Sequence, residues 1–449
     1  MWSRPSNSRV KAVVTQTVAA IVLAALAGGA IEGHKPITSP YTYNEDVFPI
    51  LRDRCARCHV SGGVAPMSLT TYKDAFPWGE SIRTELVAGH MPPGSVDDAA
   101  GKFRNARALS ARELNVLLTW VTGGNPMGNP EHTPPPVTPQ PVWPLGPPDL
   151  VVQMPSEFTM AADTNEATQE FALPIAASGG RQVRAVDLMP GNPTIVRSAT
   201  VSVKVSAAGA GRVGPISQGA APVGSAAGRI SSGPVNDGTA APERVLAVWV
   251  PGDDPVPLVE GTAFRLPPDA ELVLRVHYKK TWEHERQAMS DRTSVGLYFA
   301  SAPRSEVLAW TIAPSEQERL TPKQGTGESE VGRTLLGPAG TEQLSFTRIL
   351  DQNVHAIAIY PDSALANVHV AVTAVRPDGT HADLIRFRPQ LDWSRRYWFA
   401  DPIALPRGTR VTVTATFNDQ LLPPGAAPIA AGRPDASALR LTLNVVPST

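Results

Sequence analysis

Apolar residues recur at helical spacing at both ends of the region from residue 41 to residue 125. In "YNEDVFPILRDRCARCH", Val47, Ile50 and Leu51 would share one face of a helix that begins at Asn44. Asparagine is a favoured N-cap because its side chain can accept a hydrogen bond from an early backbone amide of the helix. The pattern therefore predicts a helix directly before a pair of cysteines.

A second helix is predicted by "LSARELNVLLTWVTGGNP". Ser110 and Glu113 have the spacing of a capping box, in which each side chain bonds the backbone amide of the other residue. The run ends at Gly123 and Gly124, and glycine commonly terminates helices. The apolar face of this helix would carry Leu114, Leu117, Leu118 and Val121.

After residue 149 the pattern changes to the alternation that is typical of β-strands. Short runs rich in valine, leucine and threonine are ended by glycine, proline, asparagine or aspartate. The sequence "PDGT" at 377–380 predicts a hairpin turn. The expected strands lie in "RQVRAVDLMPG", "ERVLAVWVPG", "ELVLRVHYKK", "TSVGLYFA", "VHVAVTAVRPDGTHADLIRF" and "TRVTVTATFND".

Proline-rich and small-residue segments divide the chain into several parts. Ten prolines in residues 126–148 predict an extended linker of polyproline type, because neither a helix nor a central strand tolerates that density. The linker separates the helical domain, 41–125, from a first β sandwich, 149–302, and a second, 303–449. The Gly-, Ala-, Ser- and Pro-rich segment 206–243 is predicted to be a disordered loop of the first sandwich.

Composition excludes several classes of protein. The 449 residues include 40 Lys and Arg and 41 Asp and Glu, and this balance argues against binding to nucleic acid or to a membrane surface by bulk charge. Forty-five prolines and 36 glycines disfavour an all-helical protein. The chain has no Gly-rich phosphate loop after a strand and no Gly-x-Ser-x-Gly motif. Acidic residues such as Asp253 and Asp254 are expected to be solvated.

The N-terminal residues 1–30 have the order of a secretory signal peptide. Arg4, Arg9 and Lys11 precede an apolar run, 12–27, which small residues follow. The run is close to the roughly 20 residues that span a bilayer, so an uncleaved membrane anchor is the main alternative and a buried helix a lesser one. Either a signal or an anchor implies that the body of the protein is periplasmic or exported.

The only two cysteines, Cys55 and Cys58, are three positions apart, and His59 follows at once. This is the attachment pattern of haem c, in which both thiols form thioether bonds to the haem and the imidazole binds its iron. A disulfide would leave the histidine unexplained, and a zinc site would lack its second ligand pair. The two helices that bracket the motif resemble the terminal helices of class I cytochrome c domains.

An iron that transfers electrons usually has a sixth ligand, for which Met67, His90 and Met91 are the candidates. We favour Met91 because Pro92 and Pro93 stiffen its loop, "AGHMPPG", and would hold the thioether in one position. This element resembles the methionine-ligand loop of many bacterial cytochromes of this type. Met67 is the alternative ligand, and its other expected role is packing under the haem.

The β region resembles a known enzyme family. The segments "PDLVVQMPSEFTM", "QEFALP", "VRAVDLMPGNPTIVRSATVSV", "ELVLRVHYKK" and "SVGLYFA" are similar to the first domain of the type II copper, ascorbate-dependent monooxygenases related to peptidylglycine α-hydroxylating monooxygenase. Many bacterial members carry an N-terminal cytochrome c domain. The resemblance spans most of 41–300 and implies a small all-α class I cytochrome c domain followed by two tandem antiparallel sandwiches with jelly-roll topology.

The copper ligands that this resemblance implies are mostly missing. Arg197 and Ser198 stand where the family has a His-His pair, and neither suits copper there, whereas His277 matches a later histidine ligand. In the second domain only His355 matches a His-x-His pair, and no methionine follows Met289. His277 and His355 are therefore interpreted as remnants of copper ligands or as structural histidines, and copper is not expected as a cofactor.

Together the patterns predict a mono-haem c-type cytochrome that transfers electrons outside the cytoplasm. Met/His ligation would favour a comparatively high reduction potential. The β region would be a catalytically silent scaffold for docking or assembly, and the partners would be redox proteins of a respiratory or photosynthetic chain. One alternative is an active copper monooxygenase that receives electrons from its own haem domain. A second is a structural subunit of a membrane electron-transfer complex.

Overall fold

The computed structural model of the chain describes residues 38–94, 96, 101–104, 108–137, 142–175, 180–204, 228–230, 243–267, 271–302, 304–314, 341–361, 368–390, 393–418 and 439–448. The expected signal or anchor, 1–30, lies outside these residues, as does most of the expected loop 206–243. Within the described part, no helix is both long and apolar enough to cross a membrane.

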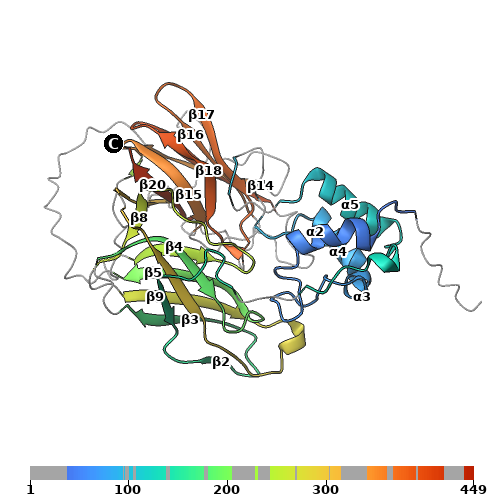
Figure 1. Cartoon of the computed structure of the whole chain (residues 1–449). Helices are drawn as coiled ribbons and strands as arrows, with labels where there is room; N and C mark the ends of the chain where they lie inside the picture. The colour runs from blue at the N-terminus through green and yellow to red at the C-terminus, as the bar shows by residue number, and fades with distance from the viewer. Residues whose placement is uncertain are drawn as a thin grey trace, which may run out of the picture.

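A small helical region is followed by mainly antiparallel β sheets (Figure 1). In Figure 1 the helices, coloured blue to teal, lie beside the strands. The helical elements are η1 Tyr43–Val47, α2 Phe48–Arg54, α3 Tyr72–Ala75, η2 Phe76–Trp78, α4 Gly79–Val87, α5 Ala111–Thr122 and η4 Pro130–His132.

The N-cap of the first helical segment lies two residues earlier than predicted. Thr42 is its N-cap, and the segment opens with the π-helical turn η1. Asn44 does not cap the helix, because it is buried and its Nδ2 donates to the carbonyl oxygen of Asn129 at 2.8 Å. The side chain of Asn44, which local propensity favours as a helix cap, is thus bonded to a residue far along the chain instead.

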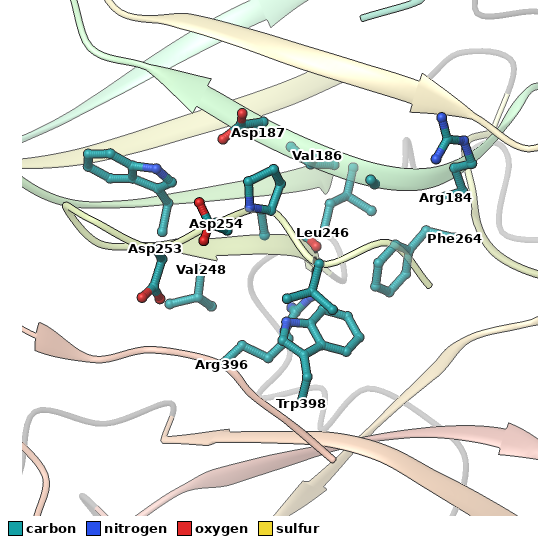
Figure 2. Close-up of a pocket in the computed structure, with 15 residues that line it drawn as sticks. Arg184, Val186, Asp187, Leu246, Val248, Asp253, Asp254, Phe264, Arg396 and Trp398 are labelled. Carbon is teal, nitrogen blue, oxygen red and sulfur yellow. Dashed lines mark hydrogen bonds between the residues drawn. The ribbon is translucent and has the colours of Figure 1, made fainter. Parts of the chain in front are cut away.

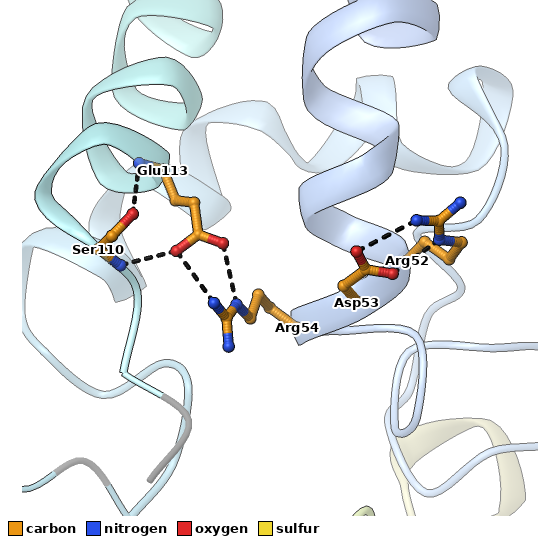
Figure 3. Close-up of polar contacts among 5 residues, drawn as sticks. All are labelled: Arg52, Asp53, Arg54, Ser110 and Glu113. Atoms are coloured by element: carbon orange, nitrogen blue, oxygen red, sulfur yellow. Dashed lines mark hydrogen bonds and ion pairs between the residues drawn. The ribbon is translucent and has the colours of Figure 1, made fainter. Parts of the chain in front are cut away.

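The capping box of α5 is confirmed. The Glu113 amide donates to Ser110 Oγ at 3.2 Å, and the Ser110 amide donates to Glu113 Oε2 at 2.7 Å. Figure 3 shows that the same carboxylate faces Arg54 at the end of α2, with Nε and Oε1 2.9 Å apart. The end of α2, just before Cys55, is therefore fixed to the start of α5.

The buried face of α5 differs in part from the prediction. Leu117 and Val121 are buried as expected, but Val116 and Trp120 complete the face, and Leu114 and Leu118 are half-buried. Trp120 is fully buried, and its indole N–H donates to the carbonyl oxygen of Pro126 at 3.0 Å. Burial of this large aromatic ring stabilises the fold more than burial of one leucine does, and the buried face of α5 includes it.

The first sandwich is built from two main sheets that share one core. Their strand orders are β1-β11-β4-β8-β12 and β3-β9-β5-β7, and a two-stranded sheet, β10-β2, lies beside them. The strands are β1 Leu150–Gln153, β2 Phe158–Met160, β3 Glu166–Pro174, β4 Gln182–Met189, β5 Val196–Lys204, β7 Glu243–Trp249, β8 Thr262–Arg265, β9 Glu271–Lys279, β10 Met289–Asp291, β11 Ser294–Phe299 and β12 Ser305–Glu306, with η5 Trp282–His284 after β9.

The second sandwich also consists of two sheets around one core, with strand orders β13-β20-β15-β18 and β17-β16-β19-β14-β6. The hairpin at 377–380 is confirmed, because the Arg376 amide donates to the carbonyl oxygen of Thr380 and the Gly379 amide donates to that of Arg376, both at 2.9 Å. The strands are β6 Gly228–Ile230, β13 Leu308–Ile312, β14 Thr341–Leu350, β15 Val354–Pro361, β16 Val368–Val375, β17 His381–Phe387, β18 Tyr397–Leu405, β19 Arg410–Asn418 and β20 Leu441–Pro447.

Strand β6 corrects the expectation for the segment 206–243. This strand lies within the segment and pairs in parallel with β14 of the second sandwich. Backbone pairing with a distant strand leaves no signal in a Gly- and Ser-rich sequence, because the hydrogen bonds do not depend on side chains. The expected disordered loop of the first sandwich therefore contributes a strand to the second.

The two sandwiches are joined through buried arginines. Arg396 Nη1 donates to the carbonyl oxygen of Leu246 at 2.7 Å, and its guanidinium lies over the ring of Tyr360. Arg395 forms an ion pair with Asp253 at 3.0 Å, and the two side chains are 4% and 9% exposed. The expectation that Asp253 is solvated is therefore wrong. Figure 2 shows the small cavity of about 40 Å³ at this junction.

The helical region also contacts the second sandwich. The segment between α4 and α5 forms antiparallel bridges from Val96 to Phe387 and from Phe103 to Phe399. Val96 is 7% exposed and belongs to the core of that sandwich. The helices and the sandwiches are thus connected by backbone pairing as well as by the linker.

Candidate functional site

The residues of the predicted haem motif line one cavity in the helical region. The cavity has a volume of about 300 Å³, and Cys55, Cys58 and His59 form part of its wall. Both candidate methionine ligands, Met67 and Met91, line the same cavity. Most of the remaining wall is apolar, with Leu51, Val64, Leu69, Ile82, Leu86 and Leu117.

The end of α2 positions the two cysteines. Cys55 is the C-cap of this helix, and its amide donates to the carbonyl oxygen of Leu51 at 2.9 Å. The amides of Cys58 and His59 both donate to the carbonyl oxygen of Cys55, at 3.0 and 2.8 Å. This tight turn brings the three functional side chains to one wall, and the structure does not join the thiols in a disulfide.

The surroundings of Cys55 and His59 favour their neutral forms. Burial raises the pKa of the Cys55 thiol to about 12, with the neighbouring Cys58 as a smaller cause. Burial also lowers the pKa of His59. Its Nδ1 lies 3.2 Å from the carbonyl oxygen of Met67, which can only accept, so Nδ1 carries the proton and Nε2 keeps a lone pair for a metal.

The structure separates the three candidates for the sixth ligand. His90 is not part of the cavity wall, since its side chain is 57% exposed and its Nδ1 lies 3.0 Å from Glu85 Oε2. Met91 lies in the turn that follows α4, after Ala88, Gly89 and His90, and lines the cavity. Met67 lines it as well, so the two methionines remain alternatives. The backbone role of Met67 in holding the His59 ring was not predicted.

These residues fit a haem c group. A haem c that transfers electrons typically has an apolar cavity, two thiols for attachment, an imidazole with a vacant nitrogen and a second axial donor. The cavity offers all four, and its volume falls within the range of typical cofactor and ligand sites. Cys55, Cys58 and His59 would hold the group, with Met91 or Met67 as the other axial ligand.

The cavity wall includes two residues from the sandwiches that the sequence did not indicate. Arg197 of β5 lines it, and the Nη1 atom of Arg197 donates to the carbonyl oxygen of Val64 at 2.6 Å. Trp393, just before β18, lines it as well. No sequence signal marks either residue as part of this site, because the contact depends on how the sandwiches dock against the helices.

The positions expected to carry copper remnants lie in both sandwiches. Ser198 is paired with His277 across β5 and β9, and His277 Nε2 lies 3.0 Å from Glu166 Oε1. His355 on β15 is half-buried, with its Nδ1 2.9 Å from Ser448 Oγ. In the described part of the chain, no group of three or more His, Cys, Asp or Glu side chains is placed to hold a metal ion.

Comparisons with known proteins do not assign a family to this chain. No protein-family model matches it, and no curated protein matches it. An allantoicase structure is 12% identical with a TM-score of 0.15, and the match covers 57% of this chain and 78% of that one.

Two further structures are similar at the same level. The allantoicase of Saccharomyces cerevisiae is 10% identical with a TM-score of 0.17, covering 64% of this chain and 78% of its own. The PBSX exported protein XepA is 11% identical with a TM-score of 0.16, covering 62% and 89%. Similarity this low supports no conclusion about function.

Proposed function

We propose that this protein is a mono-haem c-type cytochrome that transfers single electrons outside the cytoplasm. The observation that carries the proposal is that Cys55, Cys58 and His59, together with Met91 and Met67, line one largely apolar cavity. The chain has only two cysteines, and both lie beside a histidine whose Nδ1–H is held by the carbonyl oxygen of Met67, so that Nε2 keeps its lone pair. This combination is required for covalent haem attachment.

Each residue would have a separate role. When bound, the haem supplies an iron that changes oxidation state by one electron. Cys55 and Cys58 attach the group, and His59 ligates through Nε2 while its Nδ1 stays bonded to the Met67 carbonyl oxygen. Burial keeps the imidazole neutral, which is the form that ligates a metal. Met91 is the proposed distal ligand, and Met67 is the alternative.

The sandwiches are proposed to be a scaffold derived from a copper monooxygenase. This proposal rests on the sequence resemblance, and so do the proposed class I cytochrome fold and jelly-roll topology. Arg197 and Ser198 stand where the family has a His-His pair, which supports the proposal that the β region carries out no copper chemistry. Redox proteins of a respiratory or photosynthetic chain would then be the partners, and the export or anchoring signal at 1–30 would place the protein in the periplasm or on a membrane facing it.

The active copper monooxygenase remains the rival function. His277 and Ser198 lie opposite one another on β9 and β5, the strands where the resemblance implies ligands. A structural subunit of a membrane complex is a further alternative, which co-purification under mild detergent would reveal.

The test is a spectrum and a metal count on purified full-length protein produced in a host that attaches haem c. We expect a reduced-minus-oxidised difference spectrum of a c-type haem, one iron per chain and haem that stays with the polypeptide under denaturing conditions. The double variant Cys55→Ser and Cys58→Ser should lose the covalent haem. Two coppers per chain would support the monooxygenase instead, and wild-type protein without covalent haem would rule out the proposal.

A further inference from the structure

Arg197 extends from the first sandwich into the wall of the candidate haem cavity. It lies at the start of β5, where the pairing of β5 with β9 shifts register between Val196 and Ser198. A bulge of this kind redirects the side chain of the extra residue. Arg197 is 9% exposed, and its Nη1 donates to the carbonyl oxygen of Val64 at 2.6 Å. A cavity of the helical region therefore has a buried guanidinium from a sandwich in its wall.

The contact of Arg197 falls on the loop that supports the haem motif. The amide of Ala65, in that loop, donates to the carbonyl oxygen of Cys58 at 3.2 Å. Two residues later the carbonyl oxygen of Met67 bonds the ring of His59 at 3.2 Å. The loop is therefore connected to the motif on one side and to the sandwich on the other.

The first sandwich holds the same segment at two further points. Thr194 Oγ1 donates to the carbonyl oxygen of Gly62 at 3.1 Å. Cys58 Sγ lies 3.6 Å from the carbonyl oxygen of Pro251, between β7 and β8. Contacts from two separate loops of the sandwich fix the position of the helical region, so the guanidinium of Arg197 has a defined place beside the cavity.

The charged side chains in the cavity wall come from both the helical region and the first sandwich. Arg54 is paired with Glu113, with Nε and Oε1 2.9 Å apart, and Glu85 Oε2 lies 3.0 Å from His90 Nδ1. These two pairs belong to the helical region itself. Arg197 adds a charge from the sandwich, and a guanidinium stays protonated at every ordinary pH.

We infer that Arg197 raises the reduction potential of a haem c bound in this cavity, which makes the first sandwich part of the redox site. The inference rests on the proposed function. Reduction adds one electron to the haem iron, and a positive charge in poorly solvated surroundings favours the form that carries more negative charge. A sandwich that served as a scaffold alone would leave the potential unchanged.

The test is a spectroelectrochemical titration of full-length holoprotein. Arg197→Gln removes the charge and keeps an amide that can donate to the Val64 carbonyl oxygen. We expect the ratio of reduced to oxidised haem at a fixed ambient potential to fall about tenfold, which for one electron is about 59 mV. Arg197→Lys keeps a charge and should titrate close to the wild type. Arg197→Met is a second neutral variant, so the test does not depend on the folding of one protein.

Arg57→Gln is the matched control. Arg57 is an exposed arginine that pairs with Asp254 of the first sandwich and lies outside the cavity wall. This variant removes the same charge at the same junction and should keep the wild-type potential. A haem-loaded R197Q or R197M with the wild-type potential overturns the inference, and so does an equal fall in R57Q. Wild-type protein without covalent haem instead overturns the proposed function.

Discussion

The Nδ1 atom of His59 lies 3.2 Å from the carbonyl oxygen of Met67, eight residues further along the chain. The contact selects the tautomer whose Nε2 has a lone pair, and burial lowers the pKa of His59 toward the same neutral form. The amide of Leu69 donates to the carbonyl oxygen of His59 at 3.0 Å. The orientation of the proposed axial ligand is therefore determined by the loop that follows it.

Substitution of His59 should remove the proximal ligand without removing the haem. In His59→Ala both cysteines remain for attachment, so covalent haem should stay while the absorption spectrum changes to that of an iron lacking its imidazole. His90→Ala is the matched control, since His90 is exposed and bonded to Glu85. Absorption spectra of the two reduced proteins check this, and an unchanged spectrum in the His59 variant would contradict the assignment.

The two methionines should respond differently to truncation. Met91→Ala should lose the distal ligand, so the haem binds added imidazole or carbon monoxide readily and its reduction potential falls. Met67→Ala should keep the wild-type spectrum and lose about 2 kcal/mol of unfolding free energy, because Met67 is only partly buried. Ligand titration and urea unfolding measure the two effects. The reverse result would assign the distal position to Met67.

Local signals in the sequence predicted much of the fold. Ser110 and Glu113 form the capping box, and the alternating runs form strands, because caps and strand faces depend on residues that are close in sequence. Asn44, Trp120 and β6 departed from the expectation. In each case a partner far along the chain decides the outcome: the carbonyl oxygens of Asn129 and Pro126 for the first two, and β14 for the strand.

In the candidate site, too, some residues could be predicted from local sequence and others depend on distant parts of the chain. Cys55, Cys58 and His59 are adjacent in sequence, and the spacing of the motif brings them to one wall of the cavity. Arg197 and Trp393 enter that wall only through docking of the sandwiches, which no local pattern encodes. In the sequence, Arg197 marks only the position of a missing copper ligand, and its contact with Val64 is visible only in the structure.

Removal of the α5 cap should destabilise the helical region. Ser110→Ala leaves the Glu113 amide without its side-chain acceptor, and we expect a loss of about 1 kcal/mol of unfolding free energy. Ser110→Thr keeps a hydroxyl at the N-cap and is the control. Chemical unfolding followed by far-ultraviolet circular dichroism measures both variants. Equal stability of the two would show that the hydroxyl contributes nothing at this position.

Asp187 should make the stability of the first sandwich depend on pH. It lies in the wall of the small cavity at the junction of the sandwiches (Figure 2) and is 4% exposed. Burial raises its pKa from 3.8 to about 6, with the negative charge of Asp254 as a smaller cause, although the amide of Leu188 donates to its Oδ1 at 2.8 Å. A carboxyl with a raised pKa in the folded state resists ionisation there.

The sign of the effect follows from that shift. The contribution of Asp187 to stability is fully present below pH 3.8 and is lost as the pH rises through about 6. Asp187→Asn cannot ionise, so its advantage over the wild type in unfolding free energy should grow from near zero at about pH 4 to on the order of 3 kcal/mol at about pH 8. Urea unfolding at several pH values measures the difference, with Asp163→Asn as an exposed control. Parallel pH profiles for Asp187→Asn and the wild type would show that Asp187 ionises at no cost to the folded state.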